Sequence, residues 1–219
     1  AAQGDEQSAL EAARILRDGE SQSVRSENKP TLNESTALSP QNTPQAIFNT
    51  DHRQAEKYFT EAAKAGIPEA QYELAELLRR REVSERDPAA ARKWMREAAF
   101  SGIVDAQFRI GVANWSGIGG KVDQREAVRW LCRAAEGGSA KAAAMLAGFL
   151  MTGNGLAYSP ARAWALFMRA AKMGSENAAA TAKILERQLS LQEKRVQRSL
   201  LRIKDSKTFL EKLIPRSER

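Results

Sequence analysis

The chain has 219 residues, of which 42% are hydrophobic and 28% are charged, and its formal net charge is +7. A single cysteine, Cys132, excludes a scaffold held together by internal disulfides. The longest nearly apolar run, Ala140 to Met151, is shorter than the roughly 20 residues of a membrane-spanning helix, so no span is expected. The sequence begins at Ala1 without a leader-like segment, so any signal peptide would lie upstream or have been removed.

The N-terminal part is predicted to hold one degraded helical repeat and an insertion. In residues 1–19, the run Ser8 to Leu16 matches the later run Ala70 to Leu78. Residues 20–50 are rich in Ser, Thr, Asn and Pro and offer few side chains for a core, so they are expected to be disordered.

Residues 51–182 repeat with a step of 36 residues. Each copy contains two consecutive alanines followed by a glycine, and four further columns keep chemically similar residues at the same step. The alanine pairs begin at Ala62, Ala98, Ala134 and Ala170, and the column of large side chains comprises Tyr58, Trp94, Trp130 and Leu166. A fixed period of this length is the signature of a repeat architecture.

Local chemistry divides each copy into two antiparallel helices. Asp51, Asp87, Asp123 and Ser159 stand where side-chain oxygens cap a helix N-terminus, and proline follows two of them. Fifteen residues later come Gly66, Gly102, Gly138 and Gly174, which fit the left-handed position that ends a helix. Short links and small alanine side chains then predict close helix packing and a stacked array.

Residues 183–219 contain 11 basic and 5 acidic residues, which account for most of the net charge. Leu189, Val196, Ile203 and Leu210 lie seven apart, which predicts a basic amphipathic helix, either one long helix or a helix pair, with one apolar stripe. Three roles stay open for this helix: capping the array, pairing with a partner helix, or binding an anionic membrane or nucleic acid. Asp205 and Ser206 are positions where it could break, and Pro215 is expected to end it.

The segment Ile110 to Ala143 resembles the Sel1-like repeat. That pattern contains leucine-glycine, Gly-x-Gly, an aspartate, an aromatic and Ala-Ala-x-x-Gly. The residues in register with it are Gly111, Gly117, Gly119, Asp123, Ala127, Trp130, Ala134, Ala135 and Gly138. The resemblance implies an all-α, right-handed superhelical solenoid of four to five helix pairs, related to tetratricopeptide repeats. A true tetratricopeptide repeat is disfavoured because its period is 34 and it lacks the Gly-x-Gly loop.

No motif indicates catalysis, a metal or a cofactor. The sequence GIGGK, Gly117 to Lys121, lacks the first glycine and the Ser or Thr of a phosphate-binding loop, and is interpreted as a turn. His52 is the only histidine, so neither a multi-histidine metal site nor a Ser-His-Asp triad can form. Catalytic, metal and cofactor residues are therefore predicted to be absent, and no small-molecule substrate is expected.

The resulting hypothesis is a non-enzymatic adaptor, scaffold or regulator that binds a partner protein on the solenoid surface. The resemblance is consistent with this role, and its many periplasmic or secreted bacterial members favour such a compartment without excluding the cytoplasm. The alternative is a basic module recruited to an anionic membrane or nucleic acid through the C-terminal segment. The candidate residues for that contact are Lys194, Arg195, Arg198, Arg202, Lys204 and Lys207.

Overall fold

The computed structural model describes residues 56–80, 87–203, 206–215 and 218. The expected first repeat helix, the insertion, Asp51 and His52 lie outside this part. The described residues form helices and the links between them, and they contain no strand. The chain divides into two compact units, Ala1–Arg86 and Asp87–Arg219.

The first unit contains a helix over residues 56–64, followed by α3 (Pro68–Arg80). The buried side chains between the two helices include Phe59, Ala62 and Leu74. The Gln71 Nε2 atom donates a hydrogen bond of 3.3 Å to the Ala63 carbonyl, which joins α3 to the preceding helix. This pair confirms the predicted division of a repeat into two helices.

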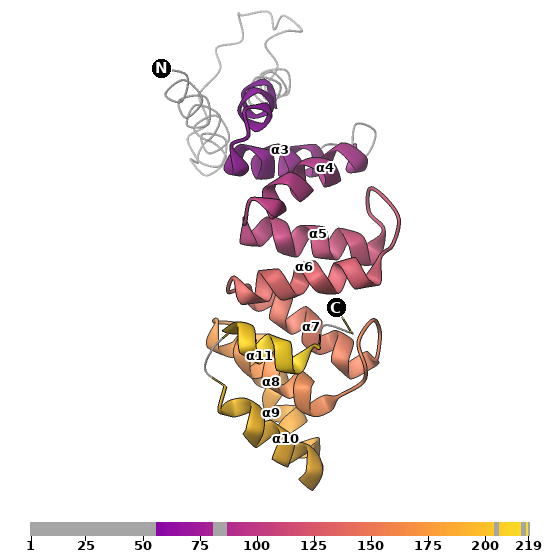
Figure 1. Cartoon of the computed structure of the whole chain (residues 1–219), viewed down its shortest axis with the longest axis vertical. Helices are drawn as coiled ribbons and strands as arrows, with labels where there is room; N and C mark the ends of the chain where they lie inside the picture. Colours follow the sequence, from indigo (N-terminus) through magenta and orange to yellow (C-terminus); the bar gives the residue numbers. More distant parts are fainter. Residues whose placement is uncertain (1–55, 81–86, 204–205, 216–217, 219) are drawn as a thin grey trace, which may run out of the picture. The chain divides into compact units, whose positions relative to one another are not determined.

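The second unit contains α4 (Pro88–Phe100), α5 (Val104–Ser116), α6 (Gln124–Glu136), α7 (Ala140–Thr152), α8 (Pro160–Lys172) and α9 (Glu176–Gln188). Successive helices follow one another along this unit (Figure 1). We call α4, α6 and α8 the first helices of their pairs and α5, α7 and α9 the second helices. The fold is an all-helical solenoid of these pairs.

The predicted helix starts are confirmed where the structure describes them. The Asp87 carboxylate accepts a hydrogen bond of 2.9 Å from the Ala90 amide, and Asp123 does the same with Glu126. Ser159 also stands at an N-cap position, but its side chain makes no capping bond. Pro160 occupies the first turn there, where a backbone amide would have no acceptor within the helix.

The Ala-Ala-x-x-Gly motif forms the turn inside each pair. At the end of α4, the Gly102 amide donates to the Ala99 carbonyl at 3.2 Å and the Ile103 amide donates to the Ala98 carbonyl at 3.1 Å. This is the Schellman arrangement, and it requires the φ of +97° that Gly102 adopts. The same two bonds recur at Gly66, Gly138 and Gly174. The paired alanines therefore contribute to both the turn and the packing, because their carbonyls close the turn and all of their side chains except that of Ala171 are buried.

The Gly-x-Gly loop joins one pair to the next. Gly117 and Gly119 both have positive φ, as the interpretation of GIGGK as a turn requires. The Arg92 guanidinium binds this loop through the carbonyls of Ile118 and Lys121, at 3.3 and 3.2 Å, and also contacts the Asn114 Oδ1 atom. The loop thus lies against α4, and a Cβ added at Gly119 would be 2.1 Å from the Pro88 carbonyl oxygen.

One buried hydrophobic cluster of the second unit extends from α6 to α11. It includes Leu131, Leu146, Leu150 and Leu166, all without exposed surface. Close approach of α5 and α6 depends on Gly111, where a Cβ would be 2.9 Å from the Leu131 Cγ atom. Trp115 on α5 stacks on Phe149 of α7 with ring centroids 4.0 Å apart, which links neighbouring pairs.

The segment 183–219, predicted to be one long basic amphipathic helix or a helix pair, contains more than one helix. The segment comprises the end of α9, then α10 (Leu191–Leu201) and α11 (Ser206–Leu213). The break before α10 has a local cause, because Ser190 and Glu193 form a reciprocal capping box that starts a new helix. The predicted break near Ser206 and the end before Pro215 agree with the bounds of α11.

Substitution of Gly119 by alanine should lower the free energy of unfolding by at least about 2 kcal/mol, because the new Cβ meets the Pro88 carbonyl and the residue keeps a positive φ. Gly148→Ala is the matched control, since a Cβ there meets nothing within 4 Å in the middle of α7 and should stabilise by about 0.5–1 kcal/mol. Denaturant titration measures both. Equal effects of the two variants would contradict the close approach.

Candidate partner-binding surface

The exposed side of α4 and α6 carries a run of cationic side chains. Lys93, Arg96 and Phe100 follow one another at spacings of three and four residues on α4, so they lie on one side of that helix. On α6, Arg125, Arg129 and Arg133 are spaced by four and also share one side. All six side chains are exposed. We call these six residues the α4–α6 strip.

An aromatic pair stands at one end of the strip. Phe100 contacts Trp130 edge to face, with ring centroids 5.0 Å apart and an angle of 72° between the ring planes. The Arg133 guanidinium lies over the Trp130 ring, 4.6 Å from its centroid. Trp130 is 1% exposed, whereas Phe100 is 63% exposed. The buried Trp130 ring therefore holds the exposed Phe100 ring in place close to the Arg133 guanidinium.

The charge of the strip is only partly balanced. Arg129 pairs with Glu126 at 3.2 Å, one turn back on the same helix. Burial lowers the pKa of Arg92, the nearby charge of Arg96 lowers it further, and Asp123 opposes these effects. The guanidinium groups along α4 therefore repel one another, and an added anionic group beside them would be stabilised.

The strip differs in chemistry from the matching positions of α8. Two columns of the 36-residue period show how α8 differs from the helices of the strip. Where α4 and α6 have Lys93 and Arg129, α8 has Ala165, and where they have Arg96 and Cys132, α8 has Met168. Ala165 is buried, whereas Lys93 and Arg129 are exposed. In the column of Lys93, Arg129 and Ala165, the first helix is therefore cationic and exposed at α4 and α6 but apolar and buried at α8.

The apolar part is covered by the C-terminal segment. α10 packs on α8, and α11 packs on α6. Figure 1 shows that the chain turns back after α10, so that α11, in yellow, lies against earlier helices of the same unit. Phe209, Leu210, Leu213 and Ile214 belong to the same buried cluster as Trp164 and Ala165 of α8.

The basic candidates in the C-terminal segment do not form one surface. Lys194, Arg195 and Arg198 lie on α10 and Arg202 just after it, whereas Lys207 lies on α11. Lys204 is outside the described residues. The apolar stripe expected beside them is divided, because Leu210 is completely buried while Val196 is 47% exposed. Most of the apolar side chains of α11 pack against the repeats instead of facing outward.

The comparisons with known proteins agree with this architecture. The sequence profile of the Sel1 repeat matches residues 40–67, 68–100, 104–139 and 140–175, which is more than half of the chain. The chain belongs to the Sel1 repeat family. No curated protein sequence matched the chain.

Two solved structures of the same kind are similar to this Sel1 repeat protein. The first is c5321, described as a protective antigen present in uropathogenic Escherichia coli strains and displaying an SLR fold, with 25% identity and a TM-score of 0.67 over 100% of this chain. This chain spans 40% of its length. The second is a Sel1 repeat protein from Oxalobacter formigenes, with 26% identity and a TM-score of 0.55, covering 80% of this chain and 73% of that one.

The described part of this Sel1 repeat protein offers no group of three or more His, Cys, Asp or Glu side chains that could hold a metal ion. Cys132 is buried in α6. Within the same residues, no helix has the length and hydropathy to span a membrane. Sequence reasoning missed the α4–α6 strip, although the columns contained its signal: Lys93 and Arg129 recur where α8 has alanine.

The start of α10 should depend on pH. Hydrogen bonds from Ser190 hold the pKa of the Glu193 carboxyl below its ordinary value. A lowered pKa means that the folded state favours the charged form, so the contribution exists above the ordinary pKa of glutamate and is lost as pH falls through the folded pKa. The melting-temperature difference between wild type and Glu193→Gln should thus be present at about pH 6 and shrink as the pH falls below the ordinary pKa of glutamate. A difference that stays constant over this range would contradict the capping box.

Proposed function

We propose that this Sel1 repeat protein is a non-enzymatic adaptor that binds a partner protein through the α4–α6 strip. Sel1 repeat proteins generally mediate protein–protein interactions. The observation that supports this site is the alignment of five exposed cations and one exposed phenylalanine along two neighbouring first helices. Such a surface combines electrostatic selection with an aromatic anchor.

The chemistry of the strip defines the partner. The strip has five cationic side chains, and one of them, Arg129, pairs with a carboxylate of the same helix. This charge favours a partner segment that is rich in Asp or Glu. Phe100 favours an apolar or aromatic side chain in the same segment, because its ring stands in solvent while Trp130 holds it from one side. We therefore expect an acidic protein segment with at least one large apolar residue, and a contact that weakens with salt.

A second candidate function uses the basic side of α10. Arg195, Arg198 and Arg202 are exposed and spaced by three and four residues, so they share one side. They could recruit the chain to an anionic membrane or nucleic acid by charge alone. Vesicles containing anionic lipid and a single-stranded oligonucleotide test this candidate. Binding that falls steeply with salt and is lost in Arg195→Glu/Arg198→Glu would favour it over the adaptor.

A photo-crosslinking residue tests the proposed adaptor site. Replacing Phe100 by p-benzoylphenylalanine keeps an aromatic ring at the exposed end of the strip. In the native host, illumination should link the protein to a defined partner. Reversal of two charges in Lys93→Glu/Arg96→Glu should reduce that product about tenfold, because opposite charges become like charges across the contact. Mass spectrometry identifies and quantifies the product.

Lys141→Glu/Lys183→Glu is the matched control, since it makes the same change in net charge at exposed positions of the second helices α7 and α9. It should leave the crosslinked product unchanged. Equal loss in both double variants would mean that net charge alone governs binding. Turnover of a small molecule by the purified protein, with no specific crosslink, would contradict the adaptor.

A further inference from the structure

Helix α11 packs on the array through one side only. Its buried residues are Phe209, Leu210 and Leu213, with Ile214 directly after it, whereas Lys207 and Lys212 are exposed. The pattern places apolar side chains at relative positions 0, 1, 4 and 5, which is one side of a helix. This is how an amphipathic helix binds a groove on another protein.

Two arginines of α8 contact α11, one near its middle and one at its C-terminal end. The Arg169 guanidinium lies over the Phe209 ring, 5.2 Å from its centroid. Seven residues earlier on α8, the Arg162 Nη1 atom donates a hydrogen bond of 2.7 Å to the Leu213 carbonyl. Because Phe209 precedes Leu213 while Arg169 follows Arg162, α11 runs antiparallel to α8.

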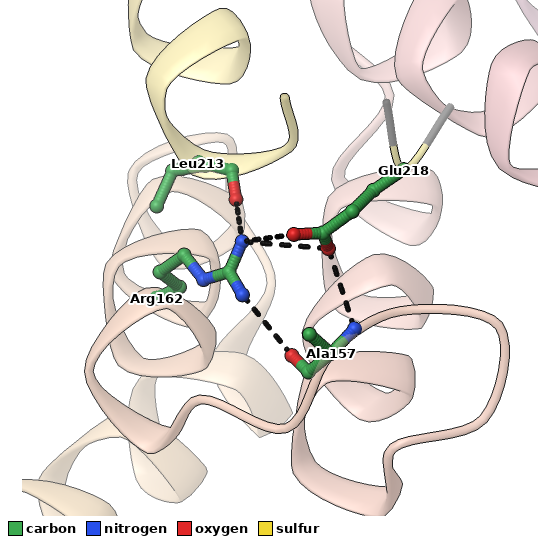
Figure 2. Close-up of polar contacts among 4 residues, drawn as sticks. All are labelled: Ala157, Arg162, Leu213 and Glu218. Atoms are coloured by element: carbon green, nitrogen blue, oxygen red, sulfur yellow. Dashed lines mark hydrogen bonds and ion pairs between the residues drawn. The ribbon is translucent and has the colours of Figure 1, made fainter. Parts of the chain in front are cut away.

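The contact at Leu213 resembles the recognition of a helix end. The last carbonyls of a helix have no partner within the helix, and Arg162 supplies a charged donor to one of them. Figure 2 shows Arg162 at the centre of this contact. Its Nη1 atom also lies 3.3 Å from the Glu218 Oε1 atom, its Nη2 atom donates to the Ala157 carbonyl at 3.2 Å, and the Ala157 amide donates to Glu218. Arg162 is thus oriented by α8's own preceding loop as well as by the C-terminal segment.

α8, whose Arg162 and Arg169 contact α11, differs from the strip in the matching columns. α8 presents Ala161, Trp164 and Ala165, all buried, where α6 has Arg125, Val128 and Arg129. Val128 and Cys132 of α6 are also buried, and they belong to the hydrophobic cluster that contains Phe209 and Leu210. The first-helix side is therefore apolar where a helix covers it and cationic where it is open. We call the covered part, with Arg162 and Arg169 at its ends, the α11 site.

We propose that the α11 site is a binding site for an amphipathic helix of a partner protein, and that α11 occupies it as an exchangeable ligand from the same chain. The partner helix carries an aromatic residue followed by aliphatic residues one, four and five positions later, and it ends at Arg162. This inference rests on the proposed adaptor function and adds to it a second contact with the partner. The partner helix must displace α11. The apparent affinity of the chain is therefore the intrinsic affinity of the free site multiplied by the fraction of chains in which α11 is undocked.

The decisive experiment uses the full chain and a synthetic peptide with the sequence of residues 206–219 as the stand-in for the partner helix. Leu210→Asp in the chain places a charge on the buried side of α11 and should release it. Fluorescence anisotropy should then show at least tenfold tighter binding of the peptide than to wild type. Lys212→Asp, the same new residue on the exposed side of α11, should bind like wild type. Adding Ala165→Glu to Leu210→Asp should abolish binding, because it places a charge in the site itself.

A second measurement avoids destabilising substitutions. A single 4-fluorophenylalanine at position 209 gives one fluorine resonance from the ring that lies over Arg169. Excess peptide should move intensity from this buried resonance to a solvent-exposed one. An unchanged resonance at a hundredfold excess, together with no gain in Leu210→Asp, would show that α11 is a permanent part of the core and overturn the proposal. Dimers that exchange α11 in the wild type would also overturn it, because the occupant would be a second copy of this chain.

The two proposals can fail separately. Lys93→Glu/Arg96→Glu should not change peptide binding at the α11 site, because both substitutions lie on α4, which contributes no residue to that site. Crosslinking from Phe100 that survives while the peptide assay fails leaves the strip as the partner-binding surface without α11 exchange.

Discussion

The turn inside each helix pair is the constraint on which the rest of the array depends. A Schellman turn needs a residue with positive φ, and Gly102 and its counterparts provide it without steric cost. The turn also fixes which carbonyls must accept, and these belong to the paired alanines. Because Ala98 and Ala99 are buried at the same place, the second helix can approach closely just where the first one ends. Backbone closure and packing therefore select the same residues, which is why the motif recurs at a fixed step.

Fixing the interior in this way leaves the outer side of the first helices free to vary. Positions such as Lys93, Arg129 and Ala165 occupy one column but differ in charge and burial. None of these side chains is needed for the turn or for the Gly-x-Gly loop. The array can therefore change from a cationic surface to an apolar one within a single repeat, and the difference in chemistry reflects what covers each part.

Features set by neighbours in sequence could be predicted, whereas features set by distant contacts could not. The caps at Asp87 and Asp123 and the left-handed glycines follow from local geometry, and the period extends them along the chain. The break at Ser190 had a local signal in the Ser-x-x-Glu pattern, but the seven-residue stripe from Leu189 to Leu210 suggested a continuous helix. The contact between Arg162 and Leu213 joins residues 51 apart outside the repeat period, so no spacing rule could have placed it.

The length of α11 has a physical consequence for exchange at its site. A helix of eight residues is too short to be stable alone in water, because nucleation is unfavourable and few hydrogen bonds follow it. Its helical state is therefore stabilised by contacts with α6 and α8, and undocking and unfolding of this segment are coupled. The entropy gained when α11 unfolds offsets part of the apolar contact that is lost. A partner helix that is longer, or that is already ordered in its own protein, loses less entropy on binding the same residues and so can compete for them.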